Sequence, residues 1–344
     1  PELVNFSGLN WTFETSFGDN PWPTNNEKQG YDTDHAIVNN NGVLEISLTK
    51  EIGNNGNTTY KSSRLISYSD DSNPVLKLER GKKLSIEFEA KMPKALNSNG
   101  NEIQDVPLWP ALWMMGSGIW NDNDNQGWPW CGEIDVMEWS SASLLDQEGV
   151  NTLGVDKYTS AIHYNNGILN NEGEEEEFNN EYYFNSYNAG INLTDDYHIY
   201  KTTISHPNDG PATIEMYFDG NKIYTYTLDD VHLNELYQTV NNSGEIIDTS
   251  KHYGLIMNIA FAGNYTGFNG DVIELENQFP TFDNATMYVK SINISNEIIS
   301  EPLQIQCLNQ DNDNSVQMSN FIYTFNNVSY NLNDNNAYIA EFSN

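Results

Sequence analysis

Hydrophobic and polar residues alternate along several short segments of the chain. The alternation is clearest at residues 42–48, 84–90 and 212–218, and the last of these runs ends at the turn residues Asp219 and Gly220. Because successive side chains of a strand point to opposite faces, a period of two predicts strands with one buried face. A series of such strands between turns is typical of an all-β sandwich of two antiparallel sheets.

A helical fold and a (β/α) barrel do not fit the pattern. No long segment has helical periodicity, and strands do not alternate with helices, which excludes a (β/α) barrel. The length of 344 residues allows one or two domains. We expect one large β-sandwich domain over residues 1–298. A boundary near Ile298 and Pro302 would separate it from a β-rich extension over residues 299–344 whose role the sequence does not indicate.

The chemically most informative segment is residues 133–138, which places Glu133, Asp135 and Glu138 among apolar, strand-forming neighbours. In a regular strand Glu133 and Asp135 share a face, and Glu138 points the opposite way. One extra residue, a β-bulge at Val136 and Met137, would return Glu138 to the shared face. Close, buried carboxyls divide into protonated and ionised groups, as a retaining glycosidase requires.

Tryptophans surround this segment. Six of the eight in the chain lie between Trp109 and Trp139, and flat aromatic rings suit the faces of sugars. The alternative is an acidic strand on a solvated face, but Ile134, Met137 and Trp139 are not typical of a surface. The acids and the aromatic rings together indicate a carbohydrate-cleaving site.

These residues resemble glycoside hydrolase family 16, and within it the laminarinase-like endo-β-1,3-glucanases. The matching signature is Glu-x-Asp-x-x-Glu at residues 133–138. Further segments resemble the family in the expected order over roughly residues 11–295: 60–67, 91–93, 109–115, 128–132, 161–164, 196–200, 216–220 and 256–263.

The resemblance implies a β-jelly-roll sandwich with a concave substrate cleft and a retaining mechanism. It assigns Glu133 as nucleophile and Glu138 as general acid, then base, with Asp135 between them tuning the proton balance. It also implies that five residues contact sugar: Arg64, Trp109, Trp113, Trp128 and His163. From the residues alone, the tryptophans and the histidine could equally belong to a core, and Arg64 could pair with a carboxylate.

Position 290 departs from the family pattern. Relatives often carry an aspartate there that ligates a structural calcium, whereas this chain has Lys290. The six histidines show no zinc-binding spacing. We therefore expect no required cofactor and no metal in the active site, and the lysine argues against the structural calcium.

The formal net charge of −34, with only fifteen lysines and arginines, limits the partners. Nucleic acid and anionic membranes are excluded because phosphates need a basic surface, and sulfated polysaccharides are disfavoured. A neutral β-glucan fits this net charge as the ligand. We also expect the protein to be a monomer. The acid excess serves solubility or, alternatively, adaptation to high salt.

Cys131 and Cys307 do not form a disulfide framework, and we expect both to be free, with a single bridge as the alternative. No signal peptide is visible, and the start at Pro1 fits a processed or recombinant chain. We expect a secreted, extracellular protein, because a polymeric glucan cannot enter a cell.

The preferred function is retaining endo-hydrolysis of β-1,3-glucan, which could extend to mixed β-1,3/1,4-glucan. Three alternatives stay open. A transglycosylase would use the same scaffold and resolve the intermediate with a sugar hydroxyl. A non-catalytic β-glucan-binding protein would typically lack catalytic acids, and here all three are present. An agarase-like enzyme would carry an identical acid motif.

Overall fold

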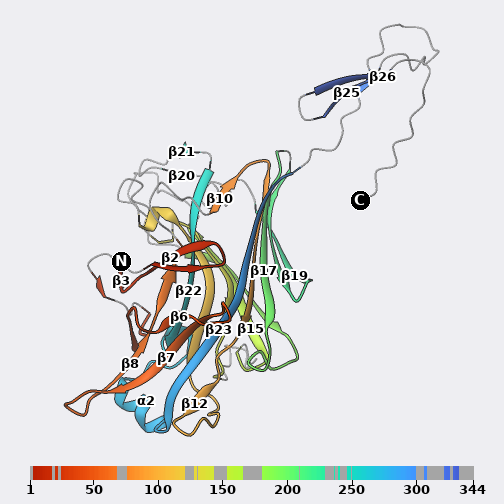
Figure 1. The fold of residues 1–344 in the computed structure, drawn as a ribbon. Helices are drawn as coiled ribbons and strands as arrows, with labels where there is room; N and C mark the ends of the chain where they lie inside the picture. Colours follow the sequence, from red (N-terminus) through yellow and green to blue (C-terminus); the bar gives the residue numbers. More distant parts are fainter. Residues whose placement is uncertain are drawn as a thin grey trace, which may run out of the picture. The chain divides into compact units, whose positions relative to one another are not determined.

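Two large β-sheets, almost entirely antiparallel, form a jelly-roll sandwich in the computed structural model (Figure 1). The chain divides into two compact units, Pro1–Ile298 and Ile299–Asn344. The described residues are 3–17, 20–21, 25–67, 76–120, 128–129, 131–142, 153–165, 180–208, 210–228, 236, 239–240, 246–248, 250–299, 306–307, 321–325 and 328–332.

The first sheet carries the predicted acids. Its strands are ordered β1-β2-β9-β22-β13-β14-β15-β16, and β10 pairs with β22. Their bounds are β1 (Leu3–Phe6), β2 (Leu9–Phe13), β9 (Arg64–Ile66), β10 (Leu76–Glu79), β13 (Leu108–Gly116), β14 (Glu133–Glu138), β15 (Lys157–Asn165), β16 (Asn180–Asn188) and β22 (Ser250–Phe261).

The second sheet has the order β19-β18-β17-β11-β23-β7-β8-β5, with β12 on β23 and β6 on β7. The bounds are β5 (Gln29–Tyr31), β6 (Ala36–Val38), β7 (Leu44–Ile52), β8 (Thr58–Ser62), β11 (Lys82–Lys91), β12 (Ala95–Asn97), β17 (His198–His206), β18 (Ala212–Phe218), β19 (Asn221–Leu228) and β23 (Phe282–Ile298). Only the β5–β8 pair in this sheet is parallel among the described pairings. Two short hairpins complete the unit, β3 (Ser16–Phe17) with β4 (Asn20–Pro21) and β20 (Thr239–Val240) with β21 (Ile246–Asp248).

The three alternating runs of the sequence form β7, β11 and β18 of the second sheet, so that prediction is confirmed. In β11, Leu84, Ile86 and Phe88 are buried while the residues between them are partly exposed. These side chains belong to one apolar core with residues of the first sheet such as Leu112 and Met114. The core between the sheets thus uses one face of each strand.

The opposite face of the first sheet, called here the outer face, has its own apolar cluster. It consists of Ile66, Ala111, Trp113, Met115, Cys131 and Ile256, with Ile119, Trp120 and Trp128 packed against it. As a result β13 is buried on both sides, and only Trp109 along it is partly exposed. This cluster adjoins the acids of β14, because β13 and β14 are neighbours.

Helical structure is scarce in the described residues. Helix α2 (Val272–Gln278) has its N-terminus closed by a reciprocal capping box between Asp271 and Glu274. Two 3₁₀ turns, η1 (Ser117–Ile119) and η2 (Asn264–Thr266), follow β13 and β22. None of the helices in these ranges has the length and apolar character needed to cross a membrane.

The second unit, Ile299–Asn344, contains a small sheet of β24 (Gln306–Cys307), β25 (Phe321–Phe325) and β26 (Val328–Leu332) in that order. Both pairings are antiparallel. In the first unit Cys131 is a free, buried thiol. The side chain of Cys307 lies outside the described residues.

Candidate active site

A β-bulge in β14 brings the three acids to one face. Trp113 of β13 lies opposite Asp135 and Leu112 lies opposite Met137, so Val136 is the extra residue. The pairing of β14 with β15 shifts between Asp135 and Glu138 as well. The bulge predicted at Val136 and Met137 is therefore present.

The register also shows which face the acids occupy. Glu133, Asp135 and Glu138 are paired with Met115, Trp113 and Ala111 of β13. Directly paired residues of adjacent strands project to the same side of a sheet. Those three β13 residues belong to the outer-face cluster, so all three carboxyls lie on the outer face beside it.

A glycine precedes the acid-bearing strand. Gly132 has a φ of +77°, a conformation that L side chains rarely adopt. A Cβ atom at this position would lie 2.6 Å from the hydroxyl oxygen of Tyr253 and 3.2 Å from Leu236. The backbone turns here because there is no side chain, and Gly132 accepts a hydrogen bond from the amide of Gly116 at 2.9 Å. This turn sets where Glu133 begins the strand.

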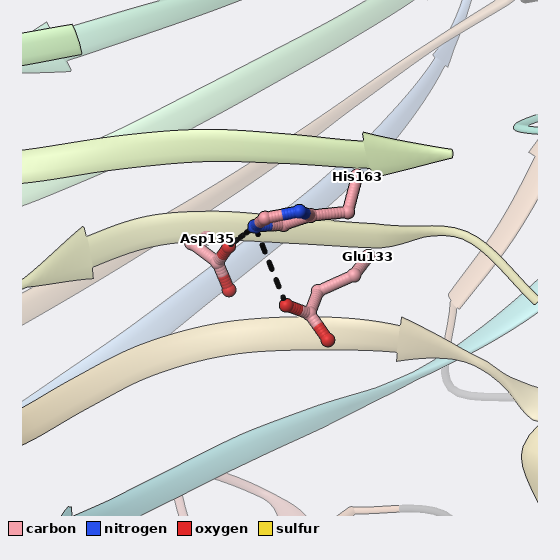
Figure 2. A group of neighbouring side chains, drawn as sticks. All are labelled: Glu133, Asp135 and His163. Atoms are coloured by element: carbon pink, nitrogen blue, oxygen red, sulfur yellow. Dashed lines mark ion pairs between the residues drawn. The ribbon is translucent and has the colours of Figure 1, made fainter. Parts of the chain in front are cut away.

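His163 lies between the first two acids (Figure 2). It comes from β15, where it is paired with Glu133. Its Nε2 atom is 3.4 Å from Oδ2 of Asp135 and 3.8 Å from Oε1 of Glu133. The imidazole therefore lies within 4 Å of a carboxyl oxygen of each acid, with the closer contact to Asp135.

Each glutamate accepts a hydrogen bond from a tryptophan. Trp128 donates its indole N–H to Oε2 of Glu133 at 3.1 Å. Trp109 donates its indole N–H to Oε1 of Glu138 at 2.8 Å. An indole N–H can donate but not accept, so each bond fixes one carboxyl oxygen and leaves the other for chemistry.

The carboxyls hold protons more tightly than isolated acids do. Burial raises the pKa of Asp135 and of Glu138 to about 8 each, and raises the pKa of Glu133 well above its usual range. Negative charge on Asp135 raises the pKa of both glutamates further, while His163 acts in the opposite direction. Three interacting carboxyls titrate together, so at neutral pH the trio retains protons that separate carboxyls would have lost.

Glu133, Asp135 and His163 each offer one ligand atom, and these atoms lie within 4.8 Å of one another, a spacing that a metal ion could bridge. The same contacts suit two carboxyls and an imidazole that share protons, and the prediction of no required cofactor stays a prediction. At position 290 the ammonium group of Lys290 lies 2.6 Å from Oε1 of Glu89. An ammonium supplies no oxygen ligand, so this residue does not fit a calcium site.

Arg64 and Trp113 were both predicted to contact sugar. Both side chains are buried at the outer face, which we call the floor of the site. Arg64 is only 4% exposed and pairs with Glu14, Nε to Oε2, at 2.8 Å. Its guanidinium lies 4.6 Å from the ring centroid of Trp113. Trp113, 9% exposed, donates to Oδ1 of Asn258 at 2.8 Å. Trp109, Trp128 and His163 are all partly exposed. Sugar contact stays a prediction for all five residues.

Five residues that the sequence did not single out complete this neighbourhood. Glu14 binds Arg64 and also accepts from the indole N–H of Trp120 at 2.8 Å. Asn258 joins Trp113 to the hydroxyl of Tyr31. Tyr265 stacks on Trp109, and its hydroxyl lies 2.9 Å from Oγ1 of Thr159. Asn258 lies in a segment that matched the family, but Glu14 and Tyr265 lie far from the acid motif and gave no local signal.

No family model and no curated protein matches the sequence. Solved structures do match. The catalytic domain of a laminarinase from Thermotoga petrophila aligns over 87% of this chain and 95% of its own, at 24% identity and a TM-score of 0.53. An endo-1,3-beta-glucanase from Streptomyces sioyaensis covers 86% and 95%, at 21% identity and a TM-score of 0.58. This chain has the laminarinase fold.

A third structure extends the likeness. The GH16 protein of the Bacteroides ovatus mixed linkage glucan PUL, solved with a G4G4G3G product, covers 83% of this chain and 94% of its own, at 23% identity and a TM-score of 0.52. The fold that the sequence resemblance implied is thus present over most of the chain. At these identities the likeness concerns the fold, and the chemistry rests on the residues described above.

Proposed function

We propose that this protein is a retaining glycoside hydrolase that cleaves β-1,3-glucan internally. The observation that carries the proposal is the placement of Glu133, Asp135 and Glu138 on one face, with each glutamate oriented by an indole N–H. Two carboxyls that flank a glycosidic bond, one ionised and one protonated, are what double displacement requires.

In the proposed first step, a carboxylate oxygen of Glu133 attacks the anomeric carbon while Glu138 protonates the departing glycosidic oxygen. The product is a glycosyl ester on Glu133 and a sugar with a free hydroxyl. Glu138, now ionised, then takes a proton from water as the water oxygen attacks the same carbon and displaces the carboxylate of Glu133, which breaks the ester bond. Both carboxyls return to their starting protonation states.

Asp135 and His163 support this exchange. Asp135 hydrogen-bonds to Glu133 and lies within 3.4 Å of the His163 ring. Its charge raises the pKa of Glu138, which favours the protonated form that the first step needs. Glu133 loses its negative charge when the ester forms and regains it when the ester is hydrolysed. In this assignment His163 lies beside that changing charge and compensates it.

A neutral glucan fits the charges near the site. Arg64, which lies over the ring of Trp113, is paired with Glu14, and the chain as a whole carries a net charge of −34. A sulfated polymer would meet this excess of acids without a matching basic surface. The product bound to the Bacteroides ovatus neighbour supports mixed-linkage glucan as a second substrate. We further infer that the protein is secreted, since the polymer is extracellular. We also infer that it acts as a monomer.

The test compares wild type with Glu133→Gln on laminarin, lichenan, agarose and carrageenan. We expect release of oligosaccharides from laminarin, retention of the β-anomer by proton NMR at early times, and a loss of at least about 1,000-fold in the variant. Inversion of the anomer, or an equally active variant, would refute the mechanism. Growth of longer products over time would indicate transglycosylation, and binding without cleavage would indicate a binding protein.

A further inference from the structure

Tyr265 lies against the side chain that orients the predicted acid/base, yet the proposed reaction gives it no role. Its ring stacks on Trp109 with centroids 5.0 Å apart and planes at 15°. Trp109 in turn donates its indole N–H to Oε1 of Glu138. The near-parallel stack restricts the tilt of the indole, and therefore the direction of that hydrogen bond.

Tyr265 is itself fixed at both ends. Its hydroxyl lies 2.9 Å from Oγ1 of Thr159, and Thr159 is the β15 residue paired with Glu138. Its backbone belongs to η2, which is held by hydrogen bonds from Gly263 to Phe268 and from Asn264 to Asn25. Contacts therefore run in a closed ring from Glu138 through Trp109, Tyr265 and Thr159 and back to the strand that carries Glu138.

The ring of contacts determines which oxygen of Glu138 is available. The bond from Trp109 occupies Oε1, so the transferable proton sits on Oε2. Burial, and then the charge of Glu138, raise the pKa of Tyr265 well above its usual range, so its hydroxyl stays protonated where it contacts Thr159.

We propose that Tyr265 is a positioning residue for acid/base catalysis, holding Trp109 so that Glu138 presents Oε2 to the glycosidic oxygen. The inference rests on the proposed function of Glu138. The ring of Tyr265 carries this role through the stack on Trp109, and the hydroxyl of Tyr265 contributes by anchoring the ring to Thr159. Removing the ring should impair protonation of the leaving group and spare the attack by Glu133.

The experiment measures kcat/KM with two substrates in wild type, Tyr265→Leu and Tyr265→Phe. Laminarin has a sugar leaving group that needs a proton, whereas a 2,4-dinitrophenyl β-laminaribioside has one that leaves without it. For Tyr265→Leu we expect a loss of about tenfold or more on laminarin and less than about twofold on the aryl glycoside. Tyr265→Phe keeps the stack and should fall between wild type and Tyr265→Leu.

The matched control is Phe268→Leu. Phe268 belongs to the same turn and packs against the core. Loss of stability at the turn should lower both activities of this variant in parallel. An equal loss on both substrates in Tyr265→Leu, or no loss on either, would overturn the inference. Wild type that cleaves neither substrate would instead refute the proposed function.

Discussion

The indole N–H of Trp128 donates a hydrogen bond to Oε2 of Glu133 over 3.1 Å. The donor lies only five residues before its acceptor, but the chain turns at Gly132 between them. One carboxylate oxygen of the predicted nucleophile is therefore occupied before substrate binds, and the other is directed toward His163. This preorganisation has measurable consequences.

Replacing Trp128 by Phe keeps a ring and removes the donor. A hydrogen bond to a charged group contributes about 1.5–3 kcal/mol, so we expect kcat/KM on laminarin to fall about 10- to 100-fold. The control is Trp120→Phe, because the indole N–H of Trp120 binds Glu14 instead. Similar losses in the two variants would show that the bond to Glu133 has no particular importance.

Replacing Asp135 by Asn should move the pH dependence of catalysis. The charge of Asp135 raises the pKa of Glu138, so its removal lowers that pKa. The acid form of Glu138 is then lost at lower pH, and the basic limb of the kcat/KM profile moves to lower pH. Trp109→Phe removes a hydrogen bond that lowers the same pKa, so its basic limb should move to higher pH. Limbs that stay at the wild-type pH in both variants would contradict the assignment of Glu138.

Replacing Glu138 by Gln should stabilise the protein at high pH. The pKa of Glu138 is raised by burial to about 8 in the folded state, so the folded protein binds more protons than the unfolded chain between roughly pH 4 and 8. Stability from this group is therefore present at low pH and lost as pH rises toward 8. We expect the variant to melt at least about 2–4 °C above wild type near pH 8 and together with it near pH 4. A difference in melting temperature that does not change with pH would show that the titration of Glu138 is not its cause.

Replacing Glu14 by Gln should destabilise the outer face, because the buried guanidinium of Arg64 would lose the carboxylate that its Nε contacts. Their side chains are only 9% and 4% exposed. Removing one partner of a buried pair costs about 3–5 kcal/mol, measured as a shift of the urea midpoint. The double variant Glu14→Gln, Arg64→Met should recover most of the loss. If the single variant is as stable as wild type, the pair does not hold the floor together.

Local pattern was sufficient to predict part of this structure. Alternation predicted β7, β11 and β18, and the bulge followed from the inference that Glu138 shares a face with Glu133 although it lies five residues further on. Both predictions depend on neighbours in the chain. The fold class followed from the same regularities.

Contacts made by long-range pairing were not predictable in this way. Glu14 meets Arg64 across 50 positions, and Tyr265 meets Thr159 across 106. Local patterns in a single sequence do not reveal which strands are adjacent in a sheet, so nothing marked these residues as neighbours of the acids. The burial of Arg64 and Trp113 depends on the outer-face cluster, whose members come from four separate parts of the chain.

The bulge at Val136 also ties the catalytic groups to the interior. Ile134, Val136 and Met137 all belong to the core between the sheets, so two consecutive residues anchor the strand just before Glu138. Any change in volume beneath them would be transmitted to the spacing of the acids. An engineer who wishes to alter substrate preference should therefore leave this strand untouched and vary segments that do not support it.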